Sequence, residues 1–249
     1  MKPNEQTDFG FSRVTAEEKT SRVREVFDSV ASNYDLMNDL MSFGLHRFWK
    51  RFMVSSVKLR PGAKVLDLAG GTGDISRLIS ESLGGSGTVV LSDINQAMLM
   101  IGRDRCIDEN VADNVVFTQA DAQQLPFGEF EFDLATIAFG LRNVTDKQIA
   151  LDEIYRVLKP GGKLLILEFS QLQIDSLKPV YDKFSFKILP RLGQIVAGDS
   201  DSYRYLAESI RTHPDQTKLK SMMEQSGYER CRYQNILGGI VALHEGMRL

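Results

Sequence analysis

The sequence predicts a doubly wound α/β fold, in which helices cover both faces of a mostly parallel sheet. Between residues 64 and 170, strand-like apolar runs alternate with helix-like stretches, which is the pattern of parallel strands joined by crossover helices. Three glycines, Gly70, Gly71 and Gly73, follow the first run directly in the stretch VLDLAGGTGD. Folds of this class bind ligands beyond the carboxyl ends of their strands. The 249 residues suit one such domain with a modest extension.

The N-terminal part of the chain contains no sheet pattern. Residues 1–15 are polar, and we expect them to be flexible. Residues 16–60 are helical in character, with apolar side chains at helical spacing from Val23 to Val30. We therefore divide the chain into an N-terminal helical segment, 1–60, expected to cover the site as a lid, and a cofactor-binding domain, 61–249.

The alternating region predicts five strands with helices between them. The strand-like runs are β-branched and almost continuously apolar, as expected for parallel strands covered on both faces. We expect strands over residues 64–69, 88–93, 114–121, 132–140 and 162–170, and helices over 75–83, 96–106 and 147–158.

The remainder of the chain predicts a helical insertion followed by a hairpin. Residues 171–215 are rich in aromatic and basic residues, and apolar side chains recur at helical spacing from Leu177 to Ile188. The segments YERCRYQNIL and GGIVALHEG then predict two strands, with Gly238 and Gly239 at their turn.

Composition excludes several classes of function. The net charge of −3 argues against a nucleic-acid partner. Cys106 and Cys231 have no metal-ligand spacing, and they predict two reduced thiols in a cytoplasmic protein. We expect no catalytic metal, because no cluster of His, Cys and acidic residues has suitable spacing. No secretory signal and no membrane-spanning run is visible, so any membrane contact is expected to be peripheral.

The three glycines predict a cofactor site. Without a Cβ, the backbone can pass close to a bound molecule, and the N–H groups of the following helix can face it. A tight turn without a ligand is the alternative. Asp93, at the end of the second strand, favours a ligand, because an acid there can accept hydrogen bonds from ribose hydroxyls. Asp121, at the end of the third strand, lies where an acid or its neighbouring backbone can meet an adenine edge.

The loop favours a nucleoside without a pyrophosphate. The fingerprint G-x-G-x-x-G of dinucleotide-binding proteins fails at its third glycine, where Ser76 stands, and no P-loop lysine is present. S-adenosylmethionine contains ribose and adenine but no phosphate. It is therefore the cofactor that fits this loop best.

Four segments resemble the motifs of class I S-adenosylmethionine-dependent methyltransferases: VLDLAGGTGD, LSDINQAML, ADAQQLPF and RVLKPGGKLLILEF. The resemblance covers about residues 60–170 and implies a seven-stranded sheet whose final strand is antiparallel. Ala69 departs from the common form of the first motif, which has glycine at this position.

More specific segments resemble the ubiquinone/menaquinone biosynthesis C-methyltransferase family: YDLMNDLMSFG followed by HRFWKR, then FGLRNVTD, and DSYRYLAESIRTHPDQ. This resemblance spans nearly the whole chain. It implies methyl transfer from S-adenosylmethionine to a ring carbon of polyprenylated quinols, namely demethylmenaquinol and a methoxy-polyprenyl-benzoquinol. The alternatives are an O- or N-methyltransferase acting on another small molecule, or a non-catalytic cofactor-binding scaffold in a quinone biosynthesis assembly.

The resemblance also implies particular cofactor contacts. They are Gly70 and Thr72 in the glycine-rich loop, Asp93 on the ribose, and Asp121 with Ala122 near the adenine. After the fourth strand the family often has serine where this chain has Ala138, so only a backbone contact is expected there.

Three residues are candidates for the chemistry. Arg142 would stabilise a quinol phenolate, because its guanidinium stays protonated at any working pH. Asn143 would orient a hydroxyl or a water, and Tyr34 would reach the site from the lid. The alternatives are a surface pair between Arg142 and Asp146, and a helix-anchoring role for Tyr34.

For His46, His213 and His244 we favour structural roles, with His46 on a solvated helix face. The insertion has two interpretations. Its apolar stripe packs on the core, or it forms an entrance for a polyprenyl tail, with its basic residues meeting anionic lipid at the inner membrane. We also consider association with other quinone biosynthesis enzymes, or a homo-oligomer.

Overall fold

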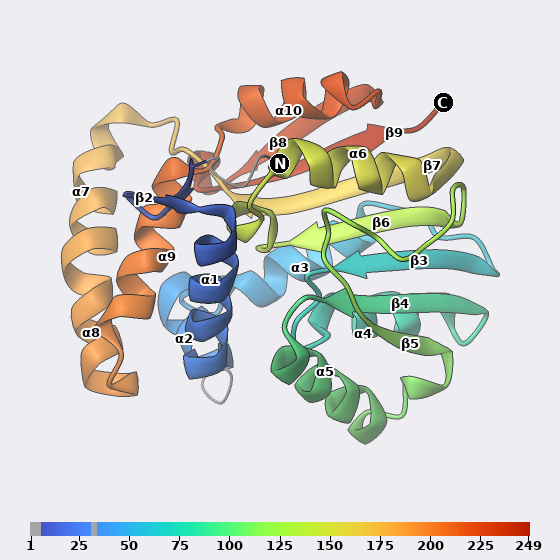
Figure 1. Cartoon of the computed structure of the whole chain (residues 1–249), viewed down its shortest axis with the longest axis horizontal. Helices are drawn as coiled ribbons and strands as arrows, with labels where there is room; N and C mark the ends of the chain where they lie inside the picture. Colours follow the sequence, from blue (N-terminus) through green and yellow to red (C-terminus); the bar gives the residue numbers. More distant parts are fainter. Residues whose placement is uncertain (1–5, 31–33) are drawn as a thin grey trace.

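The computed structural model describes residues 6–30 and 34–249, and its centre is a seven-stranded sheet (Figure 1). The strands lie in the order β5-β4-β3-β6-β7-β9-β8, and the five from β5 to β7 are parallel. β9 runs antiparallel to both β7 and β8. The predicted fold is therefore confirmed, including its antiparallel end. The bounds are β3 (Ala63–Leu68), β4 (Gly87–Asp93), β5 (Val115–Gln119), β6 (Phe132–Ala138), β7 (Leu158–Phe169), β8 (Glu229–Ile236) and β9 (Val241–Met247).

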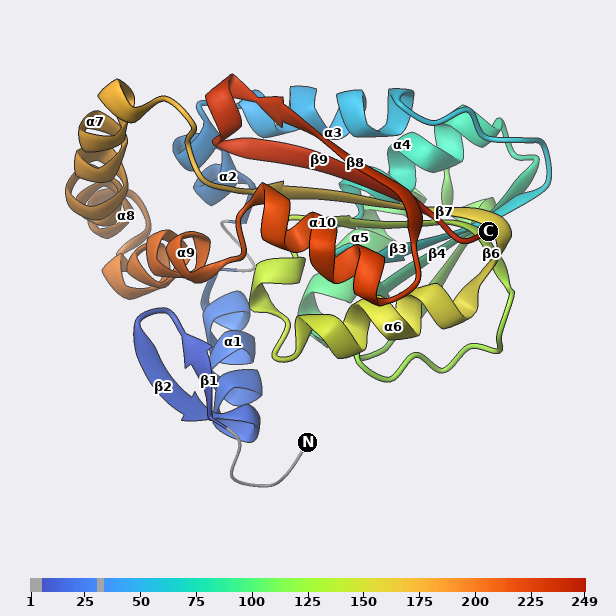
Figure 2. The same cartoon turned by 90° about the horizontal axis from the view of Figure 1, so that it is seen from above.

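Helices cover both faces of the sheet, as the near-continuous apolar strands require (Figure 2). One face packs against α3 (Leu45–Ser55), α4 (Asp74–Leu83) and α5 (Gln96–Asp108). The other packs against α6 (Lys147–Val157) and α10 (Gln216–Gln225). Each face has its own buried cluster of apolar side chains, while the edge strands β5 and β8 remain partly exposed.

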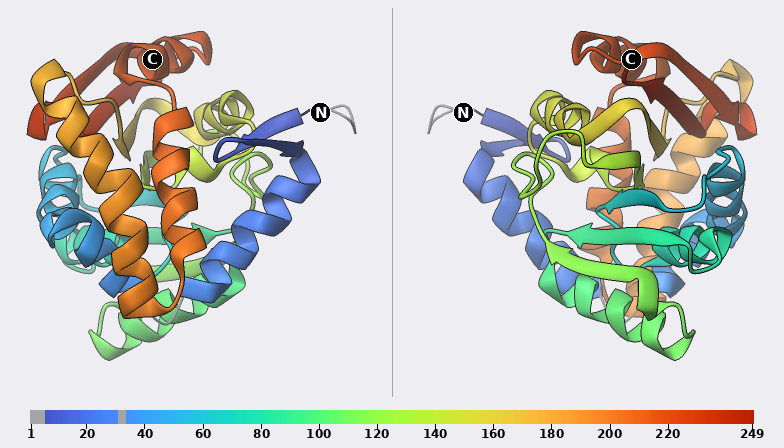
Figure 3. Two further views of the ribbon diagram at one scale, coloured as in Figure 1. Left: turned by 90° about the vertical axis from the view of Figure 1, so that its left-hand side faces the viewer. Right: turned by 90° about the vertical axis from the view of Figure 1, so that its right-hand side faces the viewer.

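The N-terminal helices and the insertion meet at the carboxyl edge of the parallel strands (Figure 1). They comprise α1 (Ala16–Val30), α2 (Tyr34–Ser42), α7 (Lys178–Lys183), α8 (Leu189–Ala197) and α9 (Ser200–Thr212). A π-helical turn over Phe184–Ile188 joins α7 to α8. The left panel of Figure 3 looks onto this edge, with these helices in front of the sheet. Any site at the strand ends therefore lies beneath them.

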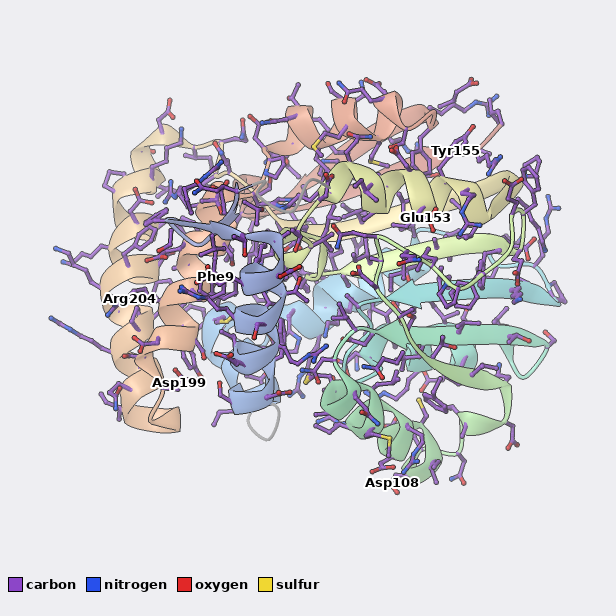
Figure 4. The ribbon with its side chains drawn as sticks, viewed as in Figure 1. Phe9, Asp108, Glu153, Tyr155, Asp199 and Arg204 are labelled. Carbon is purple, nitrogen blue, oxygen red and sulfur yellow. The ribbon has the colours of Figure 1, made fainter. Side chains whose placement is uncertain are left out.

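The expectation of a flexible stretch over residues 1–15 is wrong for its described part. Residues Gln6–Phe9 (β1) and Ser12–Thr15 (β2) form an antiparallel hairpin, with Gly10 in the left-handed region at its turn. The ring of Phe9, labelled in Figure 4, stacks on Tyr205 of α9 with centroids 4.3 Å apart. This contact ties the hairpin to the insertion, and the short polar strands gave no periodic signal for it.

The predicted C-terminal hairpin is present as β8 and β9. Gly238 and Gly239, at its turn, have φ values of +68° and +100°. A side chain is disfavoured in this region of backbone conformation, so glycine suits both positions.

Candidate functional site

The glycine-rich loop is a tight turn between β3 and α4. Gly71 and Gly73 have φ values of +53° and +83°, and the Gly73 N–H donates to the Gly70 carbonyl over 2.9 Å. Ala69 also has a positive φ, +49°, so this departure from the usual glycine carries backbone strain. The turn exposes the Gly71 backbone at the carboxyl edge of the sheet.

Asp93 closes the loop from the end of β4. One carboxylate oxygen accepts the Gly71 N–H over 2.9 Å, and the other accepts the Asn95 N–H over 2.8 Å. Burial raises the pKa of Asp93 to about 6, although these backbone hydrogen bonds favour the charged form. A buried carboxylate with remaining lone pairs is suited to receive hydroxyl donors.

Asp121 and Ala122 follow β5, in the turn on the far side of Asp93. An Asp121 oxygen accepts the Gln123 N–H over 2.9 Å, so the acid shapes this turn itself. The Gln123 side chain in turn accepts the Asp146 N–H over 2.8 Å. The turn is therefore connected to the loop that follows β6.

A cavity lies between these three strand ends and α1, and we call it the cofactor cavity. Asp93, Asp121 and Ala122 line it, as expected, together with Asn143. Gly71 lines it in place of Gly70 and Thr72, and the Thr72 side chain is buried away from solvent. One wall of the cavity comes from α1 and consists of Thr20, Val23, Arg24 and Phe27. That the N-terminal segment acts as a lid stays a prediction.

Asp67 was not among the predicted site residues, although it lies inside the opening motif. Its carboxylate is 1% exposed beneath the glycine-rich loop. It accepts from the Ser76 hydroxyl over 2.7 Å and from the Thr136 hydroxyl over 2.9 Å. Burial raises its pKa to about 6. Asp67 is the one acidic residue of β3, and this position within a buried strand could have indicated it.

Arg142 is neither a surface residue nor paired with Asp146. It is 8% exposed, and its Nη1 donates to Glu168 Oε1 over 3.0 Å and to the Phe139 carbonyl. The other oxygen of Glu168 accepts the Arg142 backbone N–H over 3.2 Å. Asp146 instead caps α6 by accepting two backbone N–H groups. Arg142 is not among the residues described as lining the cofactor cavity, whereas its neighbour Asn143 is.

Asn143 is held by the insertion. The Tyr205 hydroxyl of α9 donates to Asn143 Oδ1 over 3.1 Å. Burial raises the pKa of Tyr205 to about 12, so the phenol stays protonated and remains a donor. Because its oxygen is engaged, Asn143 can present its N–H₂ group to a ligand. Tyr205 was not predicted as a site residue. The side chain of Tyr34 lies outside the part of the chain that the structure describes.

The histidines are buried, so the expected solvated position of His46 is wrong. This residue belongs to α3 itself, it is 4% exposed, and its Nε2 lies 2.9 Å from Oδ1 of Asp39 in α2. His244 Nε2 meets the Gln216 carbonyl at 3.1 Å, and burial lowers its pKa to about 4. Neither lines the cofactor cavity. Within residues 6–30 and 34–249, no group of three or more His, Cys, Asp or Glu side chains could hold a metal ion.

The cofactor cavity fits an S-adenosyl group. It offers an acid for the ribose at Asp93, an acidic turn for the adenine at Asp121, and apolar walls from Ile94, Met98 and Phe139. A Cβ at Gly71 would lie 3.3 Å from Met98, so glycine keeps this surface open. No helix of the described chain is both long and apolar enough to cross a bilayer.

These features define the class of the protein as that of the S-adenosylmethionine-dependent methyltransferases. Solved structures with this fold include a SAM-dependent methyltransferase from Aquifex aeolicus, with a TM-score of 0.61 and 16% identity, over 86% of this chain and 98% of the other. Another is a possible histamine N-methyltransferase from Thermotoga maritima, with a TM-score of 0.63 and 17% identity, over 90% and 99% of the two chains. At these identities the likeness establishes the fold alone.

Sequence relatives are far more similar. A family model, the ubiE/COQ5 methyltransferase family, matches residues 14–248. A ubiquinone/menaquinone biosynthesis C-methyltransferase UbiE from Cellvibrio japonicus is 57% identical over 248 residues, covering 100% of both chains. One of the same name from Idiomarina loihiensis is 58% identical, covering 99% of this chain and 98% of its own. The chain belongs to the ubiE/COQ5 methyltransferase family.

Proposed function

We propose that this chain transfers the methyl group of S-adenosylmethionine to a ring carbon of polyprenylated quinols, both demethylmenaquinol and a methoxy-polyprenyl-benzoquinol. The relatives that match its full length carry the name C-methyltransferase of ubiquinone and menaquinone biosynthesis. The observation that carries the proposal is the cofactor cavity, which joins Asp93 and Asp121 to the loop of Asn143. When bound, the cofactor supplies an electrophilic methyl group.

The residues of this chain would bind and orient the two reactants. Asp93 would accept the ribose hydroxyls, and the turn at Asp121 and Ala122 would meet the adenine, with Gly70 and Thr72 shaping the loop beneath. The Asn143 N–H₂ would orient a quinol hydroxyl. Such placement of a ring carbon in line with the methyl group contributes strongly to rate.

A quinol carbon becomes a good nucleophile when the neighbouring hydroxyl ionises, so the site needs positive charge. We propose Arg142 for this role, with Tyr34 contributing from the lid. Arg142 belongs to the same loop as Asn143, and its burial strengthens its electrostatic effect. Glu168 offsets part of that charge and fixes the guanidinium.

We propose that a neighbouring apolar groove holds the polyprenyl tail. Trp49, Phe169 and Phe184 line it, and further walls come from the end of α2, from α9 and from the turn before β9. Its inner end adjoins the cofactor cavity, since the rings of Phe169 and Phe139 have centroids 4.9 Å apart. Its mouth lies at Phe43 and Leu45, which are 78% and 40% exposed. The groove supports the second interpretation of the insertion.

The groove predicts a dependence on tail length. Leu45→Glu places a charge at the mouth without filling the core. It should raise KM about tenfold for a long-tailed quinol, through loss of about 1.4 kcal/mol of apolar contact. KM for a tail-less quinol should stay unchanged, and Val116→Glu on the edge strand β5 serves as control. Equal effects on both substrates would contradict the groove.

We also propose that the mouth of this groove makes the peripheral membrane contact. Phe43 and Phe48 are 78% and 62% exposed, and the basic side chains of Arg47 and Arg51 lie on the same helix, α3. Exposed aromatic residues beside basic ones favour anionic bilayers. In sedimentation with phosphatidylglycerol vesicles, Phe43→Ser/Phe48→Ser should lose binding, and Phe130→Ser, in the turn before β6, should retain it.

Product analysis tests the function itself. With methyl-labelled cofactor and a reduced quinol, the label should appear on a ring carbon. A labelled methoxy group would indicate an O-methyltransferase. Tight cofactor binding without turnover on either quinol class would indicate a scaffold.

A further inference from the structure

A second cavity lies on the other side of the loop that carries Asn143. Its walls include the β1–β2 hairpin, α1, α9 and the start of α6. Thr145 lines both cavities, so a single stretch of backbone separates them. Arg142 and Tyr205 also line this second cavity, but the proposed methyl transfer makes no use of its lysines. We call it the lysine cavity.

Two lysines of the lysine cavity converge on one carbonyl group. Lys19 of α1 and Lys147 of α6 each donate from Nζ to the Val144 carbonyl over 3.2 Å. Lys19 is only 2% exposed. Lys147 is also the first residue of α6, where the helix dipole is positive. Placing these cations together, away from water, is unfavourable unless a negative charge joins them.

The nearby carboxylates are engaged elsewhere. Asp8 pairs with Arg13 at 2.9 Å, Glu168 pairs with Arg142, and Asp146 caps α6. Within the described residues, neither lysine ammonium has a carboxylate oxygen inside the 4.0 Å limit of an ion pair. Among the described residues Asp146 has no ion-pair partner, so Lys19 and Lys147 leave this cluster with one positive charge in excess.

His213 lies between Thr212 and Pro214 of the cavity lining, although its own side chain is not part of that lining. It is 4% exposed, and neither of its ring nitrogens has a hydrogen-bond partner among the described residues. Burial, together with the charges of Lys147, Arg142 and Lys19, holds its pKa well below the usual value. A buried imidazole without a partner indicates a missing polar group nearby.

We propose that the lysine cavity binds a small oxyanion of the phosphate class, held by Lys19 and Lys147. Two ammonium groups on different helices supply the donors, and the several oxygens of such an anion suit donors that approach from different elements. Thr145 also lines the cavity, and its hydroxyl can contribute a further donor. The hydroxyls of Ser209 and Thr212 already donate to carbonyls of their own helix. A bound anion would connect α1, a wall of the cofactor cavity, to the loop of Asn143.

The binding should depend on pH. Burial and the charge of Lys147 lower the pKa of Lys19 to about 7, and Asp8 opposes this shift. Burial also lowers the pKa of Lys147, while Glu168, Asp8 and Asp146 oppose it. An anion stabilises the protonated amines, so its binding takes up protons and weakens as pH rises above about 7.

Calorimetric titration of the full chain with inorganic phosphate, at constant ionic strength in chloride, tests the site. Wild type should bind saturably at pH 6.5. Lys19→Met and Lys147→Met should each weaken binding about tenfold or more, through loss of a charge-assisted hydrogen bond. Lys220→Met removes the same charge from a surface pair with Glu224 and should change nothing. A second titration uses dihexanoyl phosphatidic acid. If it binds more tightly than inorganic phosphate, the site recognises a lipid phosphate; if it binds more weakly, the site recognises the free anion.

Absence of saturable phosphate binding would overturn the proposal, as would affinity that neither lysine substitution alters. Loss of binding through misfolding can be distinguished from loss of the site. Because Met has about the length of Lys and carries no charge, the substitution removes a buried charge and should not destabilise the fold. The thermal midpoints of both variants without phosphate should therefore equal or exceed that of wild type. A phosphate-dependent rise in the midpoint should occur for wild type and Lys220→Met alone.

Discussion

Substitutions in the buried ion pair of Arg142 and Glu168 can separate the contribution of Arg142 to the stability of the fold from its contribution to turnover. Arg142→Met leaves Glu168, which is 1% exposed, without its cation. Its two backbone N–H donors, from Arg142 and Phe169, remain but supply no full charge. Breaking a buried ion pair in this way costs about 3–5 kcal/mol. Urea unfolding should show this as a lower midpoint with an unchanged slope.

The double variant Arg142→Met/Glu168→Gln removes both charges and keeps the shape of the acid. Its stability should return to within about 2 kcal/mol of wild type, because the uncompensated charge is gone. If Arg142 stabilises the phenolate, turnover should nevertheless stay lower by a factor on the order of 10². The loss should shrink as pH rises, because a quinol that ionises in solution needs less help from the protein.

Two results would refute this reasoning. A cost below about 1 kcal/mol for Arg142→Met is typical of a surface pair and would contradict the buried one. A double variant that is stable and turns over normally would limit Arg142 to positioning the loop, and would remove it from the chemistry.

Three further predictions concern the cofactor and its loop. Asp93→Asn should weaken S-adenosylhomocysteine binding by about 1.5–3 kcal/mol in calorimetry; unchanged affinity would exclude the ribose contact. Because the pKa of Asp93 is raised to about 6, the wild-type affinity for S-adenosylhomocysteine should fall as pH drops below 6. The affinity of Asp93→Asn should not change over this pH range. The affinity of Asp67→Asn should fall as that of wild type does. Gly102→Ala should lower the free energy of unfolding by about 1–3 kcal/mol, because its Cβ would lie 2.6 Å from the Gly71 carbonyl oxygen; a thermal melt like that of wild type would show that α5 moves aside freely. Tyr205→Phe removes the hydrogen bond to the Asn143 side chain. It should lower kcat about tenfold and leave the affinity for the cofactor unchanged. An unaltered kcat would show that Asn143 does not depend on this hydrogen bond.

The sheet was predictable because its strands carry strong local signals. Buried parallel strands appear as continuous apolar runs, and the glycine turns mark their ends. The β1–β2 hairpin was not predictable, because four-residue polar strands have almost no periodicity. What fixes it is a distant contact, the stacking of Phe9 on Tyr205. A contact across nearly 200 positions leaves no trace in local sequence.

The cofactor site was predictable for the same reason, since topology brings strand ends together whatever their distance in sequence. Asp93 and Asp121 therefore line one cavity as expected. The partners of Arg142 and Asn143 were not predictable. Glu168 lies within a strand whose apolar run gave no reason to expect a buried acid, and Tyr205 lies in a helix of the insertion, far away in sequence. Glu168 and Tyr205 are important because of their contacts with Arg142 and Asn143, and spacing in the sequence does not reveal such contacts.

The short loop after β6 connects all of these parts. Asn143 faces the cofactor cavity and is held by α9, Arg142 is fixed by β7, and the Val144 carbonyl receives lysines from α1 and α6. A movement of α1 away from this loop would break the hydrogen bond between Lys19 and the Val144 carbonyl. The α1 wall of the cofactor cavity and the loop that carries Asn143 are therefore coupled through this contact.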